Sequence, residues 1–151
     1  MVKKVDDSHP LLPDHVGLDL WRAAQAWRER LHAEMVARGH DWYGDARGQI
    51  AAHLDPRGMS QAELARRMKL SKQAVQQLLD QLEEEGIVKR EPDPKDGRGK
   101  RVVYTKKGLA ALADAVVVKR AIEADYRSQL GARAFDALVA SLRAISPRGD
   151  R

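Results

Sequence analysis

The stretch from residue 59 to residue 86 constrains the fold most strongly, because two helix starts lie close together within it. Ser60 followed by Glu63 forms the capping-box pattern that begins a helix. Ser71 is a good N-cap for a second helix, and Gly86 supplies the left-handed residue that commonly ends one. The buried stripe of the second helix has helical spacing and consists of Val75, Leu78, Leu79 and Leu82. The sequence therefore predicts two amphipathic helices joined by a tight turn.

The segment after Gly86 predicts a β-hairpin with a basic tip. Residues 87–91 and 101–105 are short β-prone runs, and the Pro, Asp and Gly residues between them are typical of a loop. The charged residues crowded near the tip are Lys95, Arg98, Lys100 and Arg101, beside Asp93 and Asp96. Two helices followed by such a hairpin form a winged helix-turn-helix, which can place one helix in a major groove while the tip reaches the neighbouring backbone.

The exposed face of the second helix carries side chains that suit DNA. This face comprises Lys72, Gln73, Gln76, Gln77 and Asp80. Glutamine can pair bidentately with adenine, and lysine can reach guanine or phosphate. Residues 83–85 are all glutamate and would repel DNA, so the reading end is expected at the N-terminus of the helix. The alternative, an ordinary solvated face, fits less well with a helix that precedes a basic hairpin.

Long amphipathic helices are predicted on both sides of this unit. The apolar positions of the first, which begins near residue 14 or 18 and is closed by Gly39, are Leu20, Ala24, Trp27, Leu31 and Met35. A second helix is predicted over 106–129, capped by Thr105 and tolerating Gly108. Its apolar positions are Leu109, Leu112, Val116, Ile122 and Tyr126. Those of a last helix after Gly131 are Ala134, Phe135, Leu138, Leu142 and Ile145. The helix over 106–129 would be about 36 Å long, which is longer than a compact monomer needs, so its apolar stripe requires a partner chain. The alternative is a larger single-chain helical bundle.

Composition and motifs narrow the functional class. The net charge of +5 in 151 residues favours polyanionic partners without identifying one. The absence of cysteine excludes disulfides, thiolate metal sites and cysteine-based redox sensing. Five histidines stand without ligand spacing, so no metal and no cofactor is expected. No nucleophile with a paired base and no Gly-rich phosphate loop appears, and the glutamates at 83–85 lie in a solvated helix run, so the chain is not expected to be an enzyme. Lacking an apolar span or signal segment, it is expected to be cytoplasmic.

The residues of the central unit resemble the MarR family of bacterial transcription regulators. The matching motifs are the Ser60-Gln-Ala-Glu-Leu-Ala run, the stripe that leads into residues 82–90, and above all Asp93 to Gly108 with its Asp96-x-Arg98 pair. The resemblance covers roughly residues 14–146. It implies a homodimer with interlocked terminal helices, binding to a pseudo-palindromic operator, and a pocket for a small-molecule effector between the dimer helices and the winged domain. It also implies that Arg98 lies at a minor groove.

These observations predict a mainly α fold with a small β-hairpin wing, in which a winged helix-turn-helix is flanked by N- and C-terminal dimerisation helices. The predicted divisions are a flexible arm (1–13), a dimerisation region (14–38 and 106–146), a DNA-binding domain (45–105) and a frayed tail (147–151). The predicted DNA contacts are Ser60, Gln61, Ser71, Lys72, Gln73, Gln76, Gln77, Lys95, Asp96, Arg98, Lys100 and Arg101. Trp42 and Tyr43 are candidates for the effector pocket, or else core anchors. The predicted function is that of a ligand-responsive transcription repressor that binds double-stranded DNA. The alternative is a winged-helix module that binds protein.

Overall fold

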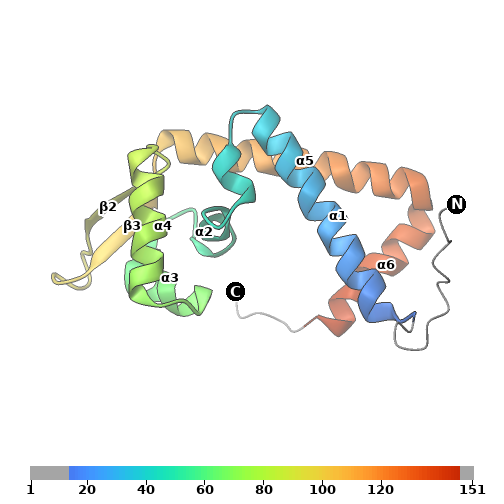
Figure 1. The fold of residues 1–151 in the computed structure, drawn as a ribbon, viewed down its shortest axis with the longest axis horizontal. Helices are drawn as coiled ribbons and strands as arrows, with labels where there is room; N and C mark the ends of the chain where they lie inside the picture. The colour runs from blue at the N-terminus through green and yellow to red at the C-terminus, as the bar shows by residue number, and fades with distance from the viewer. Residues whose placement is uncertain (1–13, 147–151) are drawn as a thin grey trace, which may run out of the picture.

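The computed structural model describes residues 14–146, so the predicted arm (1–13) and tail (147–151) lie outside it. In chain order the elements are α1 (Val16–Ala37), the 3-10 helix η1 (Asp41–Gly44), α2 (Gly48–His53), β1 (Met59–Ser60), α3 (Gln61–Met68), α4 (Lys72–Glu84), β2 (Val88–Pro92), β3 (Lys100–Tyr104), α5 (Lys106–Leu130) and α6 (Ala132–Ile145). One lobe contains α2 to α4 and the strands, α1 and α6 lie toward the other end, and α5 runs along both (Figure 1). The predicted mainly helical fold with a winged helix-turn-helix is confirmed.

The local signals of the winged lobe place its helices as predicted. The Ser60 hydroxyl accepts a hydrogen bond from the Glu63 amide at 3.1 Å, and the Ser71 hydroxyl accepts one from the Ala74 amide at 3.1 Å. The capping box forms only in part, because the Glu63 carboxylate pairs with arginines of α3 instead of reaching back to the Ser60 amide. Lys69 ends α3 in a left-handed conformation with φ 53°, which turns the chain into α4.

The wing is a three-stranded antiparallel sheet with the order β1-β3-β2, where the sequence predicted two strands. Met59 pairs with Val102, and Arg90 pairs with the same residue from the other side. The missed strand is two residues long, too short to show an alternating pattern. By pairing with β3 it fixes the start of α3 against the base of the wing.

Two hydrophobic clusters fill the molecule. The first lies inside the winged lobe, and its largest fully buried members include Ile50, Leu64, Leu79, Leu82 and Ile87. The second lies between α1 and α5 and consists of Leu31, Met35, Ala115, Val118 and Ile122. Helix α5 belongs to both, because its Ala111 lies in the first cluster. Tyr43 packs against both clusters and so stands at their junction.

The buried face of α5 differs from the one that the sequence predicted. Leu109 and Val116 are exposed, whereas the buried residues are Gly108, Ala111, Ala115, Val118 and Ile122. The backbone of α5 approaches its neighbours closely, so small residues occupy the contact. A Cβ on Gly108 would lie 2.1 Å from the carbonyl oxygen of Ile87. Gly108 is therefore required by packing and is not merely tolerated.

Several large apolar side chains remain exposed toward the helical end. They are Val16, Leu20, Trp21, Leu130, Leu138, Leu142 and Ile145. Of the predicted stripe on the first helix, only Leu31 and Met35 are buried, and Phe135 is the buried residue of α6. Within residues 14–146 none of the helices combines the length and the apolar character that a membrane span needs.

Candidate nucleic-acid interface

A recess of about 270 Å³ lies where the N-terminal end of α4 meets the start of α3 and the wing. The residues that line it are Gln61, Ala62, Lys72, Gln76, Arg98, Gly99 and Lys100. Five of the predicted DNA-contacting residues, from three separate elements, thus share one surface. The first turn of α4 therefore faces the wing.

The predicted reading face of α4 is accessible. Lys72, Gln73 and Gln77 are exposed, and Gln76 is half-buried. Ser60 and Ser71 use their hydroxyl oxygens to cap α3 and α4. Because the first amides of a helix point outward beyond such a cap, both helix starts also offer N–H groups to an anion.

The tip of the wing is shaped by its two aspartates. The carboxylate of Asp93 is largely buried and accepts a hydrogen bond from the Lys95 amide at 2.9 Å. That of Asp96 accepts one from the Arg98 amide at 3.1 Å. Asp96 therefore acts on the conformation of the loop. Among residues 14–146, the charged groups of Lys95, Arg98 and Lys100 have no carboxylate within ion-pair distance.

Three Asp-x-Arg turns in the chain show what distinguishes Arg98. In each turn the arginine amide donates to the aspartate, at 2.8 Å for Arg47, 2.8 Å for Arg57 and 3.1 Å for Arg98. The guanidinium groups of Arg47 and Arg57 also fold back onto their own aspartates. The Arg57 pair lowers the pKa of Asp55 to about 2. In the wing only the backbone bond forms, which leaves the Arg98 guanidinium directed to the surface recess.

A charged cluster joins the C-terminal half of α4 to β2. Arg90, whose side chain is 10% exposed, donates to Glu83 and, at 2.6 Å, to Asp80. Its own amide donates to the other Glu83 oxygen at 2.9 Å. These hydrogen bonds lower the pKa of the Glu83 carboxyl. Glu83 is thus a structural partner of the wing, a correction to its prediction as part of a solvated run.

The comparisons with known proteins agree with this geometry. The model of the MarR family matches residues 45–99. The structure of the repressor CouR bound to a 23-mer DNA duplex is similar over 96% of this chain and all of that one, with 25% identity and a TM-score of 0.69. Residues 45–99 thus match the MarR family, and the chain as a whole has the fold of the MarR-type structures.

Two structures of MarR from Escherichia coli share the fold of this chain. The wild-type apo form has 21% identity over 89% of this chain and 99% of that one, with a TM-score of 0.69. A cysteine-to-serine mutant complexed with operator DNA has 21% identity over 87% of this chain and 94% of that one, with a TM-score of 0.66. No curated protein matches the chain. The family matched over residues 45–99 is one of transcription regulators and not of enzymes.

Sequence reasoning missed Arg57, and it missed the contact of Arg101 with the loop that carries Arg57. Arg101 donates from its guanidinium to the carbonyl of Arg57, which ties the wing to the loop before β1. Arg57 itself is 89% exposed beside that contact. Its Asp55-x-Arg57 spacing repeats the Asp96-x-Arg98 spacing, which is the signal that could have placed it near the wing.

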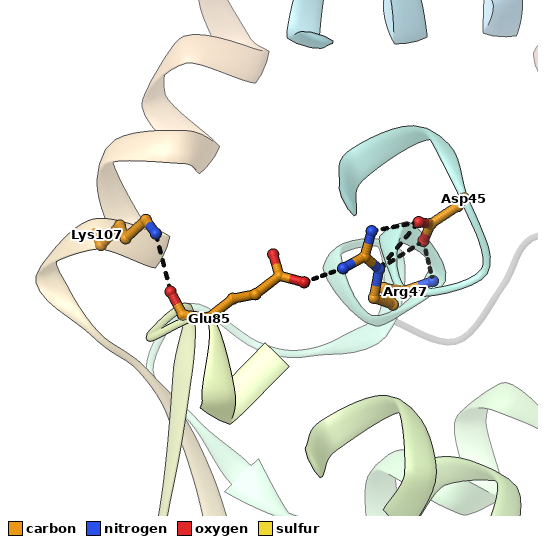
Figure 2. Close-up of polar contacts among 4 residues, drawn as sticks. All are labelled: Asp45, Arg47, Glu85 and Lys107. Atoms are coloured by element: carbon orange, nitrogen blue, oxygen red, sulfur yellow. Dashed lines mark hydrogen bonds and ion pairs between the residues drawn. The ribbon is translucent and has the colours of Figure 1, made fainter. Parts of the chain in front are cut away.

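A second ionic network ties the end of α4 to α2 and α5. Arg47 pairs with both Asp45 and Glu85, and the Lys107 ammonium donates to the Glu85 carbonyl at 2.9 Å (Figure 2). The hydrogen bond from Arg47 lowers the pKa of Asp45. Glu85, like Glu83, is therefore held by partners, so the glutamate run has structural roles at two of its three positions.

A cavity of about 400 Å³ opens between α1, the η1–α2 segment and α5. Tyr43 lines it, together with Trp27, Arg28, His32, His53 and Lys119. Trp42 is 3% exposed and lies in the winged core, because successive side chains of η1 point in different directions. The structure therefore places one of the two predicted aromatic residues at a cavity and the other in the core. Within residues 14–146, no group of three His, Asp or Glu side chains could hold a metal ion.

Proposed function

We propose that this protein is a ligand-responsive repressor that binds a pseudo-palindromic operator as a homodimer. The observation that carries the proposal is the recess in which the start of α4 meets Arg98 and Lys100 of the wing. Cations without carboxylate partners on residues 14–146 suit phosphates, and neighbouring amides suit base edges. Two similar structures contain DNA, CouR with a 23-mer duplex and the MarR mutant with operator DNA. A winged-helix module that binds only protein would have no use for this arrangement.

The side chains in the recess have separable roles. Lys72, Gln73 and Gln76 would discriminate bases in the major groove, while Arg98 would enter a minor groove. Lys95, Lys100 and Arg101 would neutralise phosphates and so position the protein. In a dimer, the two α4 helices would enter successive major grooves about 34 Å apart, on half-sites roughly 10 base pairs apart.

Two substitutions separate reading from positioning. Gln76→Ala is expected to weaken binding to a selected site by roughly 1 to 3 kcal/mol and to change binding to random duplex little. Lys100→Ala is expected to weaken both and to lower the slope of log affinity against log salt by about 1. The site is obtained by selection from a random duplex library, and affinities are measured at several salt concentrations.

Equal losses on the selected and random duplexes for Gln76→Ala would remove it from the base readers. A salt slope near zero for the unmodified protein would support the protein-binding alternative, because phosphate neutralisation requires counterion release.

The exposed apolar residues at the helical end support the homodimer. Trp21 is 62% exposed on α1, and Ile145 is 67% exposed on α6. Helix α5 has 25 residues and extends well beyond the winged lobe (Figure 1). Large apolar residues gathered at one end of a chain indicate an interaction surface. A second copy that pairs the α1, α5 and α6 surfaces would cover them.

The cavity beside Tyr43 supports regulation by a small anionic aromatic ligand. Its walls combine the rings of Trp27 and Tyr43 with the cations of Arg28 and Lys119. The Lys119 ammonium lies 5.8 Å from the centre of the Tyr43 ring. Asp45, the carboxylate of the lining, is already paired with Arg47. Ring faces beside cations that have no ion-pair partner among residues 14–146 suit an aromatic carboxylate better than a neutral ligand.

Benzoate and its neutral analogue benzamide test this ligand class. Benzoate is expected to change the fluorescence of Trp27, and Lys119→Ala should weaken its binding by roughly tenfold, since a charge-assisted bond is lost. Benzamide should bind weakly to both proteins. Lys106→Ala, the same charge change on α5 away from the cavity, is the control. Equal binding of benzoate and benzamide would contradict an anion site.

A further inference from the structure

A chain of hydrogen bonds crosses the reading surface from α3 to the wing. The Gln61 amide nitrogen donates to the Gln76 side-chain oxygen at 2.7 Å. The Gln76 nitrogen donates to Asp80 at 3.0 Å, and Arg90 donates to the same Asp80 oxygen at 2.6 Å. Gln76, the proposed base reader, is thus held from both sides before any DNA arrives.

The charges at one end of this chain determine its direction. Arginine can only donate and an ionised aspartate can only accept, so the Gln76 atom that faces Asp80 must be its nitrogen. The oxygen then faces α3, where the Gln61 nitrogen meets it. Reversing the Gln76 amide would set two acceptors against each other at Asp80. The Gln61 side-chain amide could turn over with Gln76, so it is the contact with Asp80 that fixes the orientation.

The fixed orientation leaves Gln76 with one free donor and one free acceptor. An amide group has two N–H donors and two acceptor positions, and the network uses one of each. Adenine presents an acceptor at N7 and a donor at N6, and a glutamine that offers both groups in fixed order can pair with it bidentately.

We infer that Asp80, clamped by Arg90, is a specificity-determining positioning residue that makes Gln76 select adenine. Asp80 is 53% exposed but lies one helical turn beyond Gln76, and its role is to orient the reader. Arg90 is basic and belongs to the wing, yet its side chain is turned to Asp80 and Glu83 and is 10% exposed, so it is not a phosphate contact. The inference rests on the proposed function.

Selection of binding sites from a duplex library randomised over about two helical turns tests it. The unmodified protein is expected to select an adenine at one position in each half-site. Asp80→Ala removes the acceptor that fixes the Gln76 amide, so both amide orientations become available. The preference for adenine at that position should fall by roughly tenfold while the other positions keep theirs.

Glu84→Ala is the matched control, because it removes the same charge by the same truncation at an exposed position of α4 that has no ion-pair partner among residues 14–146. It should select the unmodified sequence, as should Arg90→Lys, which keeps a cation beside Asp80. Far-UV circular dichroism and thermal unfolding verify that each variant folds.

The outcomes separate this inference from the proposed function. If the unmodified protein selects no sequence, the proposed function fails, and the role of Asp80 fails with it. If it selects a sequence that Asp80→Ala selects equally well, the function stands and the inference is overturned. Loss of preference at every position in Asp80→Ala would also overturn it, because it would show a general structural role.

Discussion

Replacing Gly108 with alanine is expected to destabilise the fold by about 3 kcal/mol, a large part of the stability of a domain of this size. The new Cβ would lie 2.1 Å from the Ile87 carbonyl oxygen and 2.9 Å from a ring carbon of Tyr104. The carbonyl cannot easily retreat, because it accepts a hydrogen bond from the Thr105 amide at 3.0 Å. The better helix propensity of alanine returns only about 1 kcal/mol, so the steric cost decides the sign.

Urea unfolding followed by circular dichroism measures this change. Gly97→Ala is the control, because nothing lies within 4 Å of a Cβ built at Gly97. It is expected to stay within about 0.5 kcal/mol of the unmodified protein. A Gly108→Ala protein as stable as the parent would mean that α5 does not pack against the Ile87 carbonyl as described.

Placing glutamates at Leu138 and Leu142 is expected to abolish the proposed dimer and to weaken operator binding by roughly 100-fold or more. Both side chains are exposed on one face of α6 in the single chain, so the substitutions leave the described cores intact. In a dimer they would bury four carboxylates in apolar contact, which costs several kcal/mol. A monomer would hold one half-site and lose the roughly 10²- to 10⁴-fold gain of bivalent binding.

Sedimentation equilibrium and operator titration on the same samples measure the two effects together. The control is a double substitution of Ala140 and Ala144 with glutamate, which adds the same charge to the opposite, exposed face of α6. Normal operator affinity in a monomeric Leu138→Glu, Leu142→Glu protein would contradict the requirement for two copies. A persistent dimer would place the interface elsewhere.

The sequence predicted those parts of the fold that local chemistry determines. The caps at Ser60, Ser71 and Thr105 are visible in the sequence because each bonds an amide three residues along. The stripe of α4 and the left-handed Gly86 are equally local. The order of helix, turn, helix and hairpin also predicted that Lys72, Gln76, Arg98 and Lys100 would lie on one surface. All four line one recess.

The parts that were missed depend on contacts between distant residues. The buried face of α5 could not be predicted, because hydrophobicity favours Leu109 and Val116 whereas the close contact selects Gly108 and Ala111. The roles of glutamates 83 and 85 depend on Arg90 and Arg47, which approach only in the folded chain. Asp80 was recognised as a surface residue of α4, but its link to Arg90 requires the position of β2.

Helix α5 contributes residues to both hydrophobic clusters, so a rotation at one cluster would displace the helix at the other. A tilt of about 6° at Lys119 would move the start of α5, some 20 Å away at 1.5 Å per residue, by roughly 2 Å. The winged lobe would follow, because Gly108 leaves no free space between the helix and the Ile87 carbonyl. Hydrogen bonds to bases tolerate only a few tenths of an ångström, so a shift of this size at each end of a dimer would carry both reading helices out of register. A ligand beside Lys119 would then need to move only a few atoms to release an operator.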